Sequence, residues 1–190
     1  IAGTVATIAA CATIGLLGLA TFLMPETTRT TRRITATRLA AVTATVWGVA
    51  GLVRLILVFA DLAGLPLTSE NFFSQLLAFV WQLESTRVLL LSALLALATA
   101  LGAAMAKGRS AMAWCLTAAL TAVVILALTG HAAGSASHED AVNALAAHLL
   151  GAVVWAGGLI GLAAMRGQLG RDLRPAHRRR SDAGSLPGPL

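Results

Sequence analysis

The sequence has little charge. Lysine, arginine, aspartate and glutamate together make up only 12% of its 190 residues, whereas 57% are hydrophobic, and the mean hydropathy is +0.81. A soluble globular domain carries about 25% charged residues. This imbalance excludes an ordinary soluble domain and predicts an integral membrane protein. A secretory signal does not explain the composition, because a signal supplies one short apolar run and the apolar runs here recur along the chain.

Cysteine is also scarce, and its placement excludes a disulfide framework. The chain has two cysteines, Cys11 and Cys115, both inside apolar segments at different expected depths and without a CxxC spacing. We predict that both are reduced and buried, and that they act as small apolar side chains. The sequence likewise lacks a basic groove or a basic helical stripe with exposed aromatics, so its pI of 11.3 does not indicate nucleic-acid binding.

Five apolar segments are each long enough to cross a bilayer as a helix. They do not alternate between apolar and polar residues as barrel strands do, and a lone segment in lipid must satisfy its own backbone hydrogen bonds. We therefore predict an all-α fold, a polytopic transmembrane bundle with about five spans. The predicted spans are residues 1–24, 34–60, 86–106, 111–129 and 141–165.

Lysine and arginine are absent from the second and fourth loops. They are concentrated in the first loop, the third loop and the C-terminal tail, where positive charge is typical of the cytoplasmic side. This pattern predicts that the N-terminus lies outside and the C-terminus inside. It also divides the chain into a membrane domain, residues 1–168, and a basic cytoplasmic tail, residues 169–190, which we expect to be disordered.

The second loop contains an aromatic insert, Asn71 to Leu83, too short to cross the membrane with its polar interruptions. We interpret it as an anchor at the outer interface or as an extension of the third span, with a gating element as the alternative. Gly157 and Gly161 form a GxxxG pair in the fifth span, and Gly15 and Gly18 recur in the first span. Such spacing favours close helix packing without indicating a function.

Three histidines surround the junction of the fourth and fifth spans. His131 and His138 flank a short Ala/Gly/Ser loop, and the S-x-x-D pattern from Ser137 predicts that the fifth helix begins there. His148 would then lie about 12 Å beyond the first turn, in the outer half of the membrane. Imidazoles at one membrane face suit copper, zinc or iron, and also haem. The alternative is that His148 hydrogen-bonds a neighbouring helix and that the loop histidines are solvated.

Trp155 follows His148 by two helical turns, so the two side chains share a face with Gly151. We expect this face to point into the bundle, where Trp155 would close the floor of a site that binds a metal or cofactor. A tryptophan that only fills space in the core is the alternative.

The segment from Thr129 to Gly134, with His138, His148 and the Val154 to Leu159 block, resembles the CopD family of bacterial copper-resistance membrane proteins. The Gly64 to Pro66 loop and the segment from Gln82 to Arg87 are similar to the form in which a CopD region is fused to a CtaG-type cytochrome c oxidase assembly region. Members of this family usually continue with further helices, and the chain begins with Ile1, so we expect it to be truncated.

The resemblance implies a multi-pass protein of the bacterial inner membrane that handles copper and is not an enzyme. It implies copper ligands at His131, His138 and His148, and copper that passes across the membrane or to oxidase assembly. The implied partners are the lipid bilayer, an external copper-binding protein and oxidase assembly factors. The residues leave two alternatives open: a b-type haem electron-transfer protein with His131 and His148 as axial ligands, and an assembly subunit whose histidines are incidental.

Overall fold

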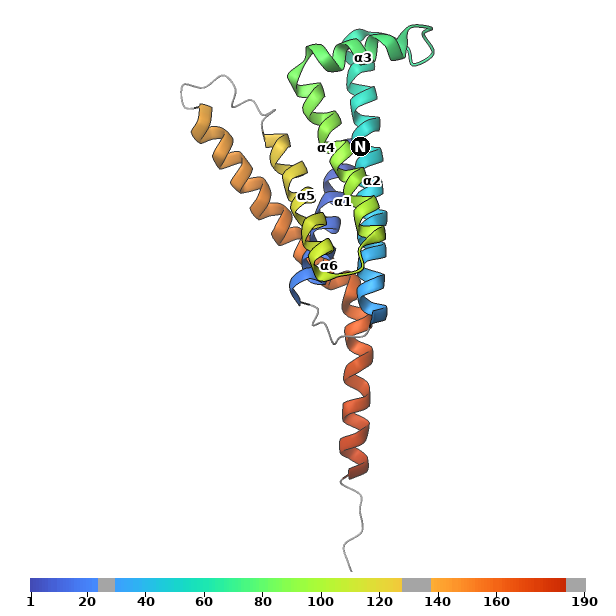
Figure 1. Ribbon diagram of the computed structural model, residues 1–190, viewed down its shortest axis with the longest axis vertical. Helices are drawn as coiled ribbons and strands as arrows, with labels where there is room; N and C mark the ends of the chain where they lie inside the picture. The colour runs from blue at the N-terminus through green and yellow to red at the C-terminus, as the bar shows by residue number, and fades with distance from the viewer. Residues whose placement is uncertain (24–29, 128–137, 184–190) are drawn as a thin grey trace, which may run out of the picture.

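The computed structural model describes residues 1–23, 30–127 and 138–183, and in these ranges the chain is helical apart from short turns (Figure 1). Within this part, five helical segments are long and apolar enough to cross a membrane. They agree with the five predicted spans, and the prediction of an all-α polytopic bundle is confirmed. The elements in chain order are α1 (Ala2–Gly18), η1 (Leu19–Leu23), α2 (Thr30–Ala63), α3 (Phe72–Gln82), α4 (Glu84–Met105), α5 (Arg109–Ala127) and α6 (His138–Ala183).

Helix α1 lies at the centre of the bundle and contacts α2, α5 and α6. Its side chains Ile14, Leu16 and Leu17 are almost fully buried, together with many alanines from the neighbouring helices. Alanine-rich faces allow helices to approach closely, and in lipid this packing replaces the hydrophobic driving force of a soluble core. The predicted burial of Cys11 and Cys115 is confirmed, and both thiols are free.

Glycines mark the closest crossing, between α1 and α6. A Cβ atom built on Gly15 would lie 1.8 Å from the carbonyl oxygen of Gly157, and one built on Gly161 would lie 2.6 Å from a methyl group of Leu19. The GxxxG pair of α6 therefore packs against α1, as its spacing predicted. Gly18 has open space around it, so only one of the two glycines of the first span serves this contact.

Polar bonds between helices reinforce the apolar contacts. The hydroxyl groups of Thr13 on α1 and Thr43 on α2 lie 2.9 Å apart, and Ser92 on α4 donates to the carbonyl oxygen of Ala122 on α5 at 3.0 Å. Such bonds fix the rotation of each helix within the bundle.

The aromatic insert forms its own helix, α3, which lies across the ends of α2 and α4 (Figure 1). Leu83 adopts an extended conformation between α3 and α4, so the insert does not lengthen the third span. Phe72 and Phe79 pack against Phe59 of α2, with ring centroids 5.0 and 5.1 Å apart. One face of α3 is thus attached to the bundle.

Helix α6 begins at His138, one residue from the predicted start at Ser137. It diverges from α5 at this end and runs beyond the bundle at the other (Figure 1). It continues to Ala183 and so includes residues 169–183 of the tail that was expected to be disordered. The domain limits 1–168 and 169–190 stay predictions.

Candidate functional site

Helix α6 carries two of the three predicted ligands, His138 and His148. His148 follows ten residues after His138, a separation of about 15 Å along the axis at the usual helical rise. Metal–imidazole bonds are only about 2 Å long, so the two rings cannot bind the same ion while α6 is continuous. The two histidines are therefore separate positions along one helix.

His148 lies five residues inside the apolar span that begins at Asn143, about 7.5 Å from its start. Its side chain is exposed in the structure. An ionisable side chain inside a membrane span is costly, and such residues usually face a cavity or a partner and serve a function. His148 is therefore the candidate ligand with the clearest structural setting.

The expected direction of the face shared by His148, Gly151 and Trp155 is wrong. Trp155 is 71% exposed, Gly151 is exposed with open space around it, and both lie away from the bundle. Trp155 therefore does not form the floor of a site inside the described bundle. A role for it in cofactor binding stays a prediction that concerns the outer surface of α6.

The rotation of α6 is set by a different face. Val153, Gly157, Gly161 and Met165 are buried and recur every four residues, so they form one stripe along the helix. At 100° per residue, Trp155 lies about 160° around the helix from Val153. Because this stripe packs against α1, His148 and Trp155 face away from α1.

His131 lies outside the described residues, and the side-chain position of His138 is likewise not described. Among the residues that are described, no group of three histidine, cysteine, aspartate or glutamate side chains could hold a metal ion. The assignment of His131, His138 and His148 as metal ligands therefore stays a prediction.

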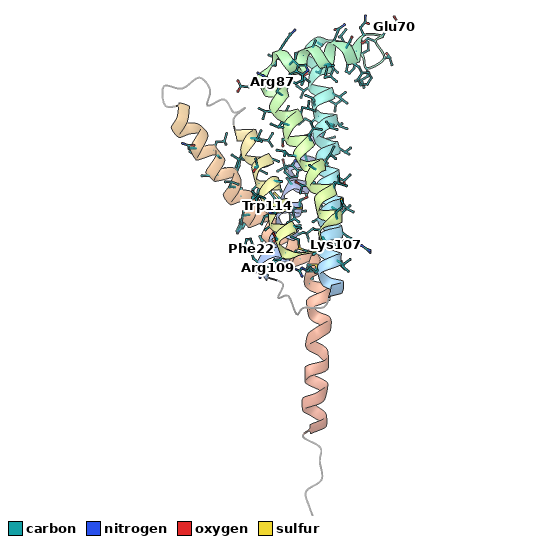
Figure 2. All side chains as sticks on the ribbon, viewed as in Figure 1. Phe22, Glu70, Arg87, Lys107, Arg109 and Trp114 are labelled. Carbon is teal, nitrogen blue, oxygen red and sulfur yellow. The ribbon has the colours of Figure 1, made fainter. Side chains whose placement is uncertain are left out.

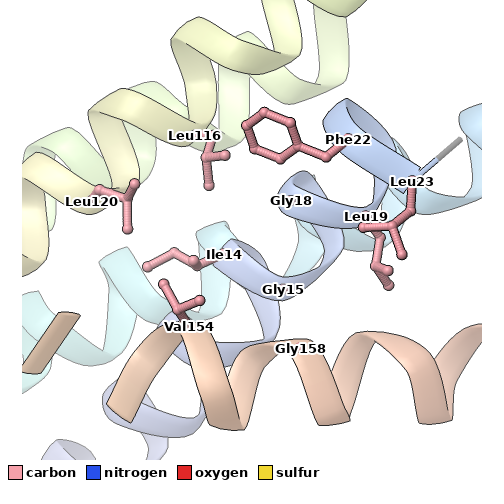
Figure 3. A pocket seen from close by; sticks show the side chains of 10 residues that line it. All are labelled: Ile14, Gly15, Gly18, Leu19, Phe22, Leu23, Leu116, Leu120, Val154 and Gly158. Carbon is pink, nitrogen blue, oxygen red and sulfur yellow. The ribbon is translucent and has the colours of Figure 1, made fainter. Parts of the chain in front are cut away.

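An apolar pocket of about 280 Å³ lies between α1, α5 and α6 (Figure 3). Ile14 of α1, Leu116 of α5 and Val154 of α6 line it together with Phe22 of η1, and its other lining residues are leucines and glycines. The pocket offers no donor atom from a polar side chain. The pocket is suited to bind a hydrocarbon chain rather than a metal ion or a polar substrate.

A second polar location, which the sequence analysis missed, lies at the end of the bundle opposite α3. Arg109, the first residue of α5, donates from Nε to the carbonyl oxygen of Thr21 in η1 at 2.5 Å. Figure 2 shows Arg109 beside Phe22 at this end, far from Glu70 and Arg87. The only signal in the sequence is an arginine directly before an apolar run.

The family comparison covers most of the chain. Residues 2–140 match the family model of the copper resistance protein D-like N-terminal domain. The matched range includes His131 and His138, whereas His148 and Trp155 lie beyond it. No curated protein and no solved structure matches the chain. Because the matched range is well over half of the chain and contains the membrane helices α1 to α5, the protein belongs to the copper resistance protein D-like (CopD) family.

Proposed function

We propose that this copper-resistance membrane protein binds copper at the end of the bundle where α6 begins, and passes it along α6 into the membrane. The observation that carries the proposal is the family match over residues 2–140, which includes His131 and His138. The exposed imidazole of His148 inside a membrane span supports it. Neutral imidazoles bind copper in either oxidation state.

The length of α6 favours two copper positions in series. His131 and His138 would form the outer position, and His148, about 15 Å deeper along the helix, would belong to an inner one. Copper that moves between them crosses part of the hydrocarbon layer without full release into lipid. An inner position needs further donors opposite the exposed face of α6, from lipid-side water or from a partner protein.

The orientation of the bundle is part of the same proposal. The arginines of the first loop and tail support an orientation in which α6 begins on the outer side of the bacterial inner membrane. Copper would then arrive from an external copper-binding protein and leave toward the cytoplasm or toward oxidase assembly factors. No step in this pathway forms or breaks a covalent bond of a substrate, so we propose a transporter or a binding protein rather than an enzyme.

Copper titration of the purified chain in lipid nanodiscs tests the proposal. We expect Cu(I), competed against a chromogenic chelator, to bind with a stoichiometry that falls in part in His138→Ala and in part in His148→Ala. His177→Ala removes a histidine of the tail and is the matched control, with binding unchanged. If every variant keeps the stoichiometry of the wild type, the histidine assignment is wrong.

Two further measurements separate the alternatives. An absorption spectrum with a strong Soret band in the purified protein would favour haem ligation by His131 and His148 over copper. Copper accumulation in cells with and without the chain gives the direction of transport. Equal accumulation in both would contradict transport and leave only a binding role.

A further inference from the structure

The end of α1 departs from regular helix geometry. Residues Leu19–Leu23 form η1, a π-helical turn, and such turns are frequent at functional sites because they break the regular ladder of backbone hydrogen bonds. Arg109 of α5 donates to the carbonyl oxygen of Thr21 within this turn. The contact brings a guanidinium group onto the end of α1.

Two polar atoms at this end are buried without a hydrogen-bond partner in the part of the chain that the structure describes. They are Oγ1 of Thr21, a residue that is 3% exposed, and Nε of Arg33 near the start of α2. Buried donors without partners are rare, because each loses its hydrogen bonds to water and forms no bond within the protein to compensate. Both atoms can donate a hydrogen bond, so an acceptor between them would satisfy both.

Arg33 and Arg109 border one buried cluster. Ala36 of α2, Met112 of α5 and Met165 of α6 pack together with Leu19 and Ala20 of η1. Arg33 precedes Ala36 by three residues and Arg109 precedes Met112 by three, so each arginine lies one turn away on the same side of its helix. Element η1, which contains Thr21, contacts both α2 and α5.

Among the residues that the structure describes at this location, the charged side chains are basic. Neither α2 nor α5 has an acidic residue in its first turn. Each helix instead places an arginine near its N-terminus, where the helix dipole already has its positive end and a cation is unfavourable. Backbone N–H groups at helix N-termini and two guanidinium groups together favour an anion with several acceptor oxygens.

We propose that Thr21, Arg33 and Arg109 form a binding site for a phosphate group, with Arg33 and Arg109 contacting its oxygens and the Thr21 hydroxyl donating to one of them. A phosphate at the end of a membrane bundle comes from an anionic phospholipid headgroup or from free phosphate. The site is distinct from the proposed copper positions, because Met165 of the adjoining cluster follows His138 by about 40 Å of α6.

Thermal unfolding of the full chain tests this site. The protein is purified in neutral detergent and heated with added phosphatidylglycerol, with phosphatidylcholine of the same acyl chains, or with inorganic phosphate. We expect phosphatidylglycerol to raise Tm more than phosphatidylcholine does. A rise with inorganic phosphate alone assigns the site to free phosphate, and no rise with it assigns the site to the lipid headgroup.

Variants separate this site from general attraction between positive charge and anionic lipid. Arg33→Gln with Arg109→Gln should reduce the extra rise in Tm by at least half, whereas Arg38→Gln, an exposed arginine of α2, should retain it. Thr21→Val keeps the side-chain shape and the net charge, and it should also reduce the rise. The proposal is wrong if the two lipids act equally and inorganic phosphate does not raise Tm, or if Arg38→Gln loses as much of the rise as the other variants.

Discussion

Gly15 is the residue at which α1 and α6 approach most closely. A methyl group there would meet the backbone of Gly157, which cannot move aside as a flexible side chain would. Gly18, one turn further along α1, has open space around it. The two glycines therefore form a matched pair for a test of close packing.

We expect Gly15→Ala to lower the free energy of unfolding by about 1–3 kcal/mol, the usual cost of overpacking. Gly18→Ala should leave stability unchanged or raise it by up to about 1 kcal/mol, because alanine favours the helix. Thermal unfolding in detergent, followed by circular dichroism, measures both. Equal losses in the two variants would contradict the observed crossing.

Ser92 provides a second test at the level of single residues. Its hydroxyl group donates across the α4–α5 interface, whereas the hydroxyl group of Thr117 donates within its own helix and is exposed. Ser92→Ala should cost about 0.6 kcal/mol, as hydrogen bonds between membrane helices typically do. Thr117→Val should cost less in the same unfolding measurement, and the reverse order would argue against the bond between helices.

The sequence could not predict the direction of Trp155. Two faces of α6 are equally apolar: one carries Val153, Gly157 and Gly161, and the other carries Trp155 and Leu159. Hydrophobic periodicity distinguishes a buried face only where the opposite face is polar. The glycine spacing was the better guide, because close approach depends on small side chains rather than on hydrophobicity.

At the scale of elements, α3 presents apolar residues on two faces. Phe72 and Val80 are buried against the bundle, whereas Phe73, Leu77 and Trp81 are 72%, 60% and 68% exposed. The exposed three recur every four residues and so form one stripe. A helix with such a stripe and no charged residue is suited to lie in the membrane interface.

This stripe predicts that α3 lies at the depth of the membrane interface. Spin labels at positions 73, 77 and 81, in a chain with both native cysteines replaced by alanine, should be more accessible to oxygen than to a water-soluble nickel complex. A label at Gln75, which is exposed on the same helix, is the control and should show the opposite preference. Equal accessibility at all four positions would mean that α3 does not lie at the interface.

At the scale of the whole molecule, the spans were predictable to within a few residues, because unbroken apolar runs are the strongest signal that a sequence contains. The site was less predictable. Metal ligation depends on how loops fold back, and His131 lies in a segment that hydrophobicity does not constrain. The contact between Arg109 and Thr21 depends on the tertiary approach of α5 to η1, which no local pattern encodes.

The topology itself is testable with fusions. Alkaline phosphatase inserted after Gly64, in the turn between α2 and α3, should be active because that loop is predicted to lie outside. The same enzyme inserted after Gly108, between α4 and α5, should be inactive. Activity at Gly108 and not at Gly64 would show that the bundle has the opposite orientation. The α6 histidines would then lie on the cytoplasmic side.

The crossing of α1 and α6 has a mechanical consequence. Helix α6 is held at Gly157 and Gly161, and its His138 end stands apart from α5 (Figure 1). Such a helix can tilt about its contact with Gly15. A tilt of about 10° at this point would swing the His138 end, about 28 Å away, by about 5 Å. A ligand that binds at the His138 end and tilts α6 would therefore displace the opposite end of the helix in the opposite direction.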